Sequence, residues 1–387
     1  MPTKRSSALL KSLTSELPQM KATLRRYVEC ESPSCAPEAI NSLATLIASD
    51  FAALGGKVRL HKSKTHGPAL QVDFAGARCK PHLLLLGHMD TVYPLGTLRT
   101  MPWSERAGKL SGPGIFDMKA GVVQALFALK ALLAAGTLPP TITLLLVPDE
   151  EIGSPFSRPL TERLAKKASA VLVLEPAAGE DGACKTSRKG VARYTLRVHG
   201  HAAHAGLDFE RGASAIVEAA HQVLTLSALS RPREGLTLNA GLISGGTRPN
   251  VVADLAEATF DVRFTRASQA AKIERAMRGL KAKGSRCTIE VSGGVERGCF
   301  ERSKATAQLY RTAAKAAERL GFALGEAAVG GASDGNLTSA MGIPTLDGLG
   351  GVGDGAHAAH EFVIARELPH RAALLAELIN DLAEEIN

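Results

Sequence analysis

Short apolar runs alternate with helical patterns along the first half of the chain. The apolar runs cover residues 83–86, 142–147 and 170–174, and each is bounded by polar or turn residues. Residues 7–55 have the pattern of amphipathic helices that end at Gly55-Gly56, and residues 118–135 predict a helix that is apolar nearly all round. Strands without polar alternation are typical of a sheet covered by helices on both faces.

The middle of the chain has a different pattern. Residues 194–198 alternate like a half-exposed strand, and they are followed by a predicted helix (212–230), two strands (236–243 and 253–263), a helix (268–282) and a final strand (287–291). This β-α-β-β-α-β order is typical of a split-βαβ, ferredoxin-like sandwich. From about residue 301 the helix and apolar-strand pattern returns. We therefore predict an α/β domain of residues 1–187 and 301–387, with a mixed, mostly parallel sheet, interrupted by an α+β domain of residues 188–300.

Composition and charge narrow the class of protein. The chain has 387 residues, 45% of them hydrophobic, which is more than one ordinary domain core accommodates. Aromatic residues make up only 4%, which argues against a base-stacking surface for nucleic acids. The net charge is +8, and residues 188–297 hold 17 basic and 10 acidic side chains, with no run of five basic residues. Such dispersed charge favours solvated faces and a few groups that attract an anionic substrate, and it predicts neither a nucleic-acid nor a membrane partner.

Cysteine usage and hydropathy suggest a compartment. The cysteines form no CxxC pair, which excludes a zinc-knuckle or redox motif, and they are Cys30, Cys35, Cys79, Cys184, Cys287 and Cys299. Free thiols are typical of a reducing compartment. The N-terminus lacks the apolar region of a signal peptide, and no stretch reaches the roughly 18 consecutive apolar residues of a membrane span. We expect a cytoplasmic protein.

Metal-binding side chains follow the three apolar strands. His88 and Asp90 come after the first, Glu150 and Glu151 after the second, and Glu175 directly after the third. Sites in open α/β sheets form beyond the carboxyl ends of the strands, so these groups are expected at one edge. A further acid, at position 117, precedes the long helix in a glycine-rich segment that can present it at the same edge.

Imidazole and carboxylate groups without thiolates suit zinc, cobalt or manganese. His88, Asp117, Glu151 and Glu175, together with a later histidine, exceed the three ligands that one catalytic zinc needs, so they predict two ions that share a carboxylate. Of the adjacent acids Glu150 and Glu151, one can ligate while the other acts as a general base. Each of these three motifs, taken alone, also has a structural explanation: the His-x-Asp sequence can be incidental, the Glu-Glu pair can be a solvated turn, and the Glu-Pro pair can simply end a strand.

Seven ordered segments resemble one known family. They are GHMDTVYPLGTL, GPGIFDMKAG, PDEEIGS, VLEPA, HAAHAG, RPNVVAD and GASDGN, spread between about residues 80 and 363. Together they are similar to the zinc metallopeptidases typified by carboxypeptidase G, whose wider family includes aminoacylase, succinyl-diaminopimelate desuccinylase and acetylornithine deacetylase. The resemblance implies a split catalytic α/β domain and an inserted lid that commonly dimerises, so we expect a homodimer through residues 188–300.

The resemblance also implies roles for the strand-end residues. His88 and Glu175 would hold one Zn²⁺ and Glu151 the other, Asp117 would bridge both ions, Glu150 would be the general base, and Asp90 would orient His88. The last ligand of the second ion is a choice between two histidines. The family places it four residues before the Glu of a Glu-aromatic-Val sequence, which selects His357 over His360.

The inserted domain supplies substrate-binding candidates by the same resemblance. His204 matches a lid histidine that stabilises the oxyanion, often from the partner subunit, while His199 and His201 have no such match. Asn250 and Arg263 match positions that bind the substrate carboxylate, although Arg263 could instead form a structural ion pair. Residues 330–336 resemble a substrate-facing loop.

The expected activity is hydrolysis of an amide or peptide bond beside a free carboxylate. The motifs favour a glutamate carboxypeptidase that acts on a small peptide or N-acyl amino acid. An N-acyl-amino-acid deacylase or a dipeptidase would use the same residues. A non-catalytic binding protein that retains the fold is the alternative from another class, and the complete set of ligands and base weighs against it.

Overall fold

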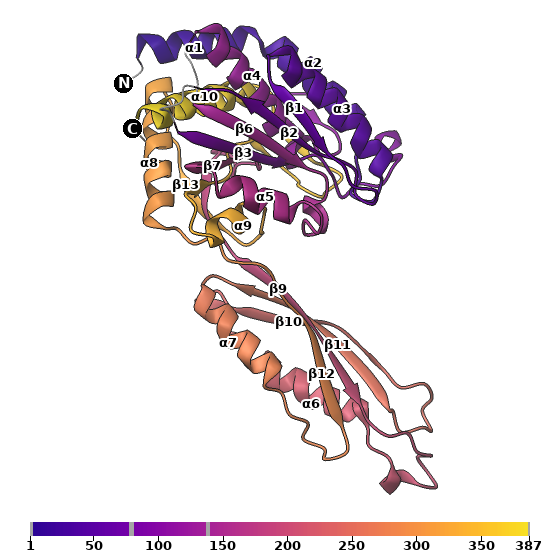
Figure 1. The fold of residues 1–387 in the computed structure, drawn as a ribbon. Helices are drawn as coiled ribbons and strands as arrows, with labels where there is room; N and C mark the ends of the chain where they lie inside the picture. The colour runs from indigo at the N-terminus through magenta and orange to yellow at the C-terminus, as the bar shows by residue number, and fades with distance from the viewer. Residues whose placement is uncertain (1–2, 77–80, 137–139, 386–387) are drawn as a thin grey trace. The chain divides into compact units, whose positions relative to one another are not determined.

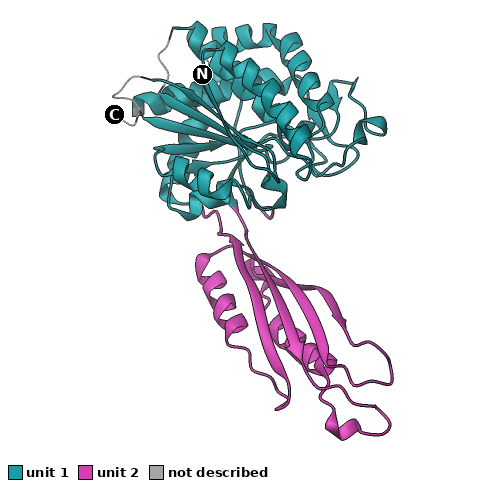
Figure 2. Cartoon of the chain, turned by 45° about the vertical axis from the view of Figure 1, so that its right-hand side comes forward, with its two compact units in different colours: residues 1–187, 302–329, 333–387 teal, residues 188–301, 330–332 magenta. Residues whose placement is uncertain are grey.

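A computed structural model of the chain describes residues 3–76, 81–136 and 140–385, so Cys79 lies outside the described residues. The chain forms two compact units. Unit 1 comprises residues 1–187, 302–329 and 333–387, and unit 2 comprises residues 188–301 and 330–332 (Figure 2). Each unit has its own hydrophobic core, described in turn below.

Unit 1 is built on a six-stranded sheet with the order β1-β2-β6-β3-β7-β14. Its strands are β1 (Lys57–His61), β2 (Ala69–Phe74), β3 (His82–His88), β6 (Thr141–Val147), β7 (Ala170–Val173) and β14 (Thr345–Leu346). The four strands from β6 to β14 run parallel, whereas β1 and β2 are antiparallel to their neighbours. The predicted α/β class with a mixed, mostly parallel sheet is confirmed.

Helices cover both faces of this sheet. They are α1 (Lys4–Ser15), α2 (Leu17–Glu29), α3 (Pro37–Ala53), α4 (Ala120–Ala134), α5 (Arg158–Ala165), α8 (Lys304–Leu320), α9 (Gly335–Ala340) and α10 (Glu367–Glu385). Leu83 and Leu85 of β3 point into the large core with α3, α4 and α10, while Leu84 and Leu86 point into the core with α5. Figure 1 shows α4 and α10 on one side of the sheet and α5 on the other. This two-sided burial explains why β3 shows no polar alternation.

Smaller elements bring distant segments of unit 1 together. A four-stranded sheet has the order β15 (Gly353–Asp354), β16 (Phe362–Ile364), β5 (Lys109–Ser111) and β4 (Ser104–Arg106), and β8 (Cys184–Arg188) pairs with β13 (Glu326–Val329). Short helical turns lie at η1 (Thr97–Arg99), η2 (Ile115–Lys119) and η3 (Glu150–Ile152). Because β16 pairs with β5, the loop between β15 and β16 lies beside the segment that follows β5.

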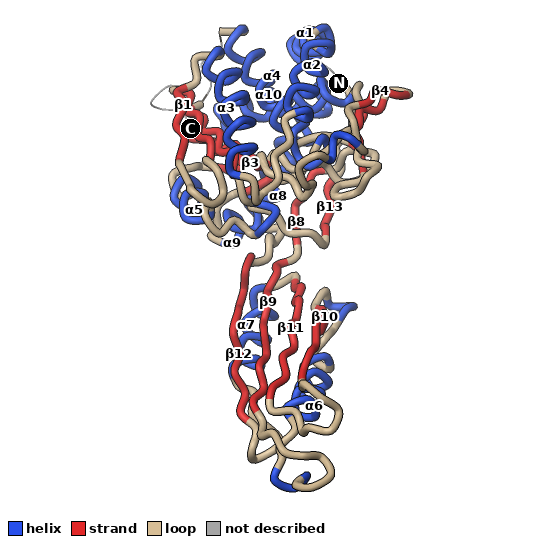
Figure 3. Tube along the Cα trace, turned by 90° about the vertical axis from the view of Figure 1, so that its right-hand side faces the viewer, coloured by secondary structure: helices blue, strands red, loops and turns tan. Residues whose placement is uncertain are grey.

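Unit 2 is a four-stranded antiparallel sheet with the order β10-β11-β9-β12 (Figure 3). In chain order its elements are β9 (Gly190–His199), α6 (Ala215–Ser227), β10 (Thr237–Gly245), β11 (Leu255–Phe264), α7 (Ala267–Arg278) and β12 (Thr288–Arg297), with short turns η4 (Phe209–Arg211) and η5 (Pro232–Glu234). Tyr194, Phe260 and Met277 are fully buried in the core between the helices and the sheet. The predicted β-α-β-β-α-β order is therefore confirmed.

Two further sequence expectations concern cysteines and membranes. The described cysteines are all thiols, and none of them is in a disulfide. Within residues 3–76, 81–136 and 140–385, no helix combines the length and the apolar character that a membrane span requires.

Candidate metal centre

Three adjacent parallel strands end at the same edge of the unit 1 sheet. β3 lies between β6 and β7, and it ends at His88. Glu150 and Glu151 lie in η3 just beyond β6, and Glu175 lies just beyond β7. Parallel strands bring their carboxyl ends together, so the structure gathers these side chains as the sequence pattern predicted.

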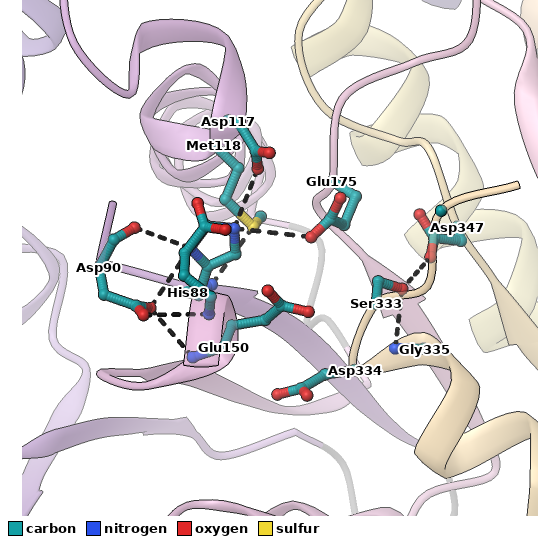
Figure 4. A network of polar contacts seen from close by, with 12 residues as sticks. His88, Asp90, Asp117, Met118, Glu150, Glu175, Ser333, Asp334, Gly335 and Asp347 are labelled. Atoms are coloured by element: carbon teal, nitrogen blue, oxygen red, sulfur yellow. Dashed lines mark hydrogen bonds and ion pairs between the residues drawn. The ribbon is translucent and has the colours of Figure 1, made fainter. Parts of the chain in front are cut away.

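His88 is the buried imidazole at the centre of this edge, with only 2% of its surface exposed. Its Nε2 lies 3.0 Å from Asp117 Oδ1 and 3.5 Å from Glu175 Oε1. Its Nδ1 lies 3.0 Å from the main-chain oxygen of Asp90, and its backbone N–H donates to the sulfur of Met118 (Figure 4). Since Nδ1 is held by a carbonyl, Nε2 is the nitrogen that faces the two carboxylates and is placed to ligate a metal.

Asp117 faces two histidines at once. Oδ1 lies 3.0 Å from His88 Nε2, and Oδ2 lies 3.3 Å from His357 Nε2. Asp117 sits in η2, directly before α4, and a Cβ on Gly121 would lie 2.1 Å from the main-chain oxygen of Leu174. Glycine therefore allows α4 to begin against the end of β7, which brings Asp117 beside Glu175. The two carboxylate oxygens have the arrangement that a bridging ligand needs.

The second group of ligands joins η3 to the loop between β15 and β16. His357 Nε2 lies 3.0 Å from Glu151 Oε2, and Glu151 is nearly buried, with 6% of its side chain exposed. His357 has a φ of 64°, which is uncommon for a residue other than glycine and is often found at functional sites. His357 and His360 are both exposed, but of these two histidines only His357 belongs to a ligand group. The geometry thus places His357, the histidine preferred from the sequence, beside Asp117 and Glu151.

Buried carboxylates perturb the pKa values of both histidines. Burial alone lowers the pKa of His88, but Asp117, Asp90 and Glu175 raise it well above its usual value. Hydrogen bonds to Asp117 and Glu151 raise the pKa of His357 to about 10. Burial raises the pKa of Asp117, but the two histidines outweigh burial and hold that pKa below its usual range. The carboxylates therefore favour positive charge on both imidazoles, and a metal ion that bound here would have to displace those protons.

Asp90 organises the acid pair as well as His88. Its carboxylate accepts the backbone N–H groups of Glu150 and Glu151, each at 3.1 Å, and the hydroxyl of Ser34 at 2.7 Å. Asp90 Oδ1 also lies 3.5 Å from His88 Nδ1. The two carboxylate oxygens thus hold the backbone of the turn that carries Glu150 and Glu151. Figure 4 shows the Glu150 side chain extending toward the region of Glu175 and Asp334.

The described residues fit two metal ions that share one ligand. His88, Asp117 and Glu175 form one group and Asp117, Glu151 and His357 form the other, and within each group the ligand atoms lie within 4.8 Å of one another. Two imidazoles and three carboxylates, without thiolates, are a donor set suited to zinc, cobalt or manganese. Two divalent cations would also neutralise three acids gathered at a largely buried edge.

Two of the residues assigned to substrate lie together in unit 2. His204 and Val251 form an isolated antiparallel β-bridge, and the N–H of Ala205 donates to the main-chain oxygen of Asn250 at 3.0 Å. Both His204 and Asn250 are exposed. The Nδ1 atom of His204 accepts the backbone N–H of Gly206 at 3.1 Å, so Nε2 carries the proton in the neutral ring and is the available donor.

Arg263 lies near the other end of β11. Leu255 begins this strand just after Asn250, and Arg263 lies eight residues further, which is roughly 27 Å along an antiparallel strand. The guanidinium donates from Nε and Nη2 to the two carboxylate oxygens of Asp261, at 2.8 and 2.9 Å. The structural ion pair considered from the sequence is therefore present. It occupies two of the five N–H donors and fixes the plane of the remaining three.

The loop of residues 330–336 is divided between the units. Residues 330–332 belong to unit 2, where Arg188 donates to the main-chain oxygen of Gly331 at 3.2 Å. In unit 1, the hydroxyl of Ser333 donates to Asp347 at 2.7 Å (Figure 4), and the hydroxyl of Ser154 donates to Asp334 at 2.5 Å. These buried contacts tie Ser333 to the segment that follows β14 and Asp334 to the segment that follows η3.

Sequence reasoning missed three polar residues around the centre. Ser34 donates to Asp90, and the hydroxyl of Tyr93 donates to the main-chain oxygen of Ala358 at 3.0 Å. Glu361 is fully buried and accepts backbone N–H groups from the segment that carries Asp117. In the sequence, Glu361 was used only to choose between His357 and His360. Its place directly before an apolar strand could have identified it as a further candidate residue of the site. The sequence offers no comparable signal for Ser34.

Comparisons with known proteins agree with this geometry. Residues 84–381 match the model of "Peptidase family M20/M25/M40". Carboxypeptidase G2 from Pseudomonas sp. (strain RS-16) is 31% identical over 98% of this chain and 93% of its own length. Aminopeptidase PepT from Bacillus cereus is 23% identical, with a TM-score of 0.76, over 95% of this chain and 99% of that one. The Bacillus subtilis YXEP protein, described as a dinuclear metal binding peptidase, is 16% identical, with a TM-score of 0.71, over 97% of this chain and 99% of that one. The two structures support the fold alone.

Proposed function

Because this chain belongs to peptidase family M20/M25/M40 and is therefore a metallopeptidase, we propose that it uses two zinc ions to cleave an amide or peptide bond adjacent to a free carboxylate. The observation that carries the proposal is Asp117, whose two oxygens face His88 in one ligand group and His357 in the other. Co²⁺ or Mn²⁺ suit the same ligands. We also propose, from the free thiols, that the protein acts in the cytoplasm.

The favoured reaction is release of a C-terminal, glutamate-like amino acid. The support is the similarity to carboxypeptidase G2, which extends over 98% of the chain. An N-acyl-amino-acid deacylase or a dipeptidase remains the second candidate, because the same ligands and base serve those substrates.

In the proposed mechanism, residues of the chain transfer one proton and bind two negative groups, the oxyanion that forms during attack and the substrate carboxylate. When bound, the two metal ions would lower the pKa of a water molecule and polarise the scissile carbonyl. Glu150 accepts the proton of the attacking water and returns it to the leaving nitrogen. His204 donates a hydrogen bond to the oxygen that becomes negative. The free N–H groups of Arg263, together with the Asn250 side chain, hold the substrate carboxylate.

A substrate panel tests the proposed function. We expect N-acyl glutamates to be hydrolysed with zinc and to be resistant after treatment with a chelator. Conversion of the α-carboxylate to a carboxamide should lower kcat/KM by about 10–100-fold, because charge-assisted hydrogen bonds contribute roughly 1.5–3 kcal/mol. The same panel includes neutral N-acyl amino acids and dipeptides, assayed with zinc, cobalt and manganese. Faster turnover of neutral substrates, or an equal rate for acid and carboxamide, would favour the deacylase or dipeptidase instead.

We further propose that two chains supply the substrate-binding residues of one site. His204 and Asn250 lie beside each other before the start of β11, whereas Arg263 lies near the end of this strand, more than about 25 Å away. One chain therefore cannot place all three on one small substrate. The surface of unit 2 suits a second copy. β10 is an edge strand, and exposed apolar side chains lie on α6 and β10, namely Ile216, Val217, Leu224, Leu242 and Ile243.

Mixed dimers test this arrangement. His204→Ala and Arg263→Ala chains should each lose activity, by about 10²–10³-fold for the oxyanion donor. Dimers formed from both chains should contain one intact site, so random mixing in a symmetric dimer restores about a quarter of wild-type activity. The rate is measured after co-refolding and compared with each variant alone. Absence of any recovery would mean that His204 and Arg263 act within one chain, or not on the same substrate.

A further inference from the structure

A buried carboxylate lies behind the bridging ligand. Glu361 is 0% exposed, and its two oxygens accept three backbone N–H groups of one short segment. Oε2 accepts from Gly114 at 2.9 Å, and Oε1 accepts from Phe116 at 2.7 Å and from Asp117 at 2.9 Å. More than 240 residues separate Glu361 from this segment in the sequence, so the contact is purely tertiary.

These hydrogen bonds act on the backbone of the bridging residue itself. Consecutive N–H groups that converge on one anion form a concave anion-binding nest, and here the anion is a side chain of the same protein. The N–H of Asp117 is one of the three donors, and its nitrogen is bonded directly to the Cα that carries the ligating side chain. Fixing that peptide plane therefore limits the directions in which Asp117 Oδ1 and Oδ2 can point.

Glu361 also belongs to the loop that carries His357. The N–H of Glu361 donates to the main-chain oxygen of Ala358 at 3.1 Å, and the N–H of Ala358 donates to that of Gly355 at 2.9 Å. The hydroxyl of Tyr93 donates to the same Ala358 oxygen at 3.0 Å. The loop is thus compact around His357, and the Glu361 carboxylate attaches it to the segment of Asp117.

The two ligand groups differ in what supports them. In the first group, His88 ends β3 and Glu175 follows β7, so two paired strands of the central sheet fix their spacing. In the second group, Asp117 and His357 both come from connecting segments, and Glu361 hydrogen-bonds directly from one to the other. Asp117 is common to both groups, but the first group keeps two ligands that the sheet holds, so the second group depends more strongly on this carboxylate than the first does.

We propose that Glu361 is a positioning residue that sets the distance between Asp117 and His357, and thereby the affinity of the second metal ion. The inference rests on the proposed two-metal function and deepens it. Glu361 contacts neither substrate nor metal, because its two oxygens are engaged by the backbone of the Asp117 segment.

Zinc titration of the metal-free protein by calorimetry tests the proposal without substrate. In Glu361→Gln an NH₂ group replaces one acceptor oxygen and faces backbone donors. We expect the second ion to bind about 10–100-fold more weakly, as is usual when a residue that supports a metal ligand is lost. The first ion should be weakened much less, because the sheet holds its other two ligands, His88 and Glu175. When Co²⁺ is added one equivalent at a time, the visible spectrum should differ from that of the wild type more for the second equivalent than for the first.

Glu31→Gln is a matched control for a purely structural role. Glu31 likewise accepts two backbone N–H groups, from Gly96 at 2.7 Å and Leu98 at 2.8 Å, but this segment carries no ligand of either group. The control should leave both zinc affinities unchanged. Unchanged affinities in Glu361→Gln, or equal weakening of both ions, would overturn the proposal.

A second variant covers the case in which Glu361→Gln does not fold. Tyr93→Phe removes the hydroxyl that donates to the main-chain oxygen of Ala358 and also hydrogen-bonds the Glu361 carboxylate, while Glu361 itself stays in place. A selective loss of affinity for the second ion would support the proposal, and no change in either affinity would overturn it. A wild-type protein that binds fewer than two ions would instead refute the two-metal function itself, and this inference with it.

Discussion

Replacing Glu150 with glutamine is expected to lower kcat by about 10²–10⁴-fold, the usual contribution of a general base. The amide cannot accept the proton of the attacking water. Bound zinc should remain at the wild-type level, because Glu150 belongs to neither of the two ligand groups. Steady-state kinetics and elemental analysis of the same preparation check both statements.

Glu151→Gln is the paired variant for this prediction. Glu151 Oε2 lies 3.0 Å from His357 Nε2 within the second ligand group, so this variant should lose zinc as well as activity. Both acids donate their backbone N–H groups to Asp90, which makes the two substitutions comparable in their effect on the turn. Loss of zinc from the Glu150 variant and its retention in the Glu151 variant would exchange the two roles.

Replacing His357 with alanine is expected to remove about one zinc ion per chain, because a second ion would keep only Asp117 and Glu151 as ligands. Activity should fall with the metal content. His360→Ala is the matched control, since His360 lies in the same loop and its side chain is exposed. Elemental analysis after dialysis measures both variants, and greater zinc loss from His360→Ala would reassign the ligand.

Much of the fold could be predicted from the hydrophobic pattern. Residues 83–86 are uniformly apolar because helices cover both sheet faces, and this pattern is local enough to read from the sequence. The strand ends then located His88, Glu151 and Glu175 at one edge. The order of helices and strands along the chain in unit 2 also followed from local periodicity. The match to peptidase family M20/M25/M40 confirms the resemblance that the ordered motifs indicated.

The parts that depend on long-range contacts could not be derived in this way. The pairing of β16 with β5 places His357 beside Asp117, and no local pattern encodes a contact between segments more than 240 residues apart. The hydrogen bonds of Glu361 are also contacts between segments that lie far apart in the sequence. The ion pair of Arg263 is different, because Asp261 lies two residues earlier on the same face of β11, and a period of two could have predicted it.

Asp90 shows how the structure adds to a role taken from a motif. The sequence suggested that its carboxylate orients His88, but the closest partner of His88 Nδ1 is the main-chain oxygen of Asp90. The carboxylate, whose Oδ1 lies 3.5 Å from the same nitrogen, also accepts the N–H groups of both adjacent acids. Asp90 therefore links the first metal ligand to the base and to a ligand of the second ion.

The central claim is that two metal ions share Asp117. Anomalous diffraction from crystals grown with zinc, recorded on both sides of the zinc absorption edge, tests it most directly. The account predicts two peaks per chain, roughly 3.5–4 Å apart, on either side of the Asp117 carboxylate. One of them should lie beside His88 and Glu175, and the other beside Glu151 and His357. A single peak per chain, or two peaks that do not share Asp117, would contradict the account.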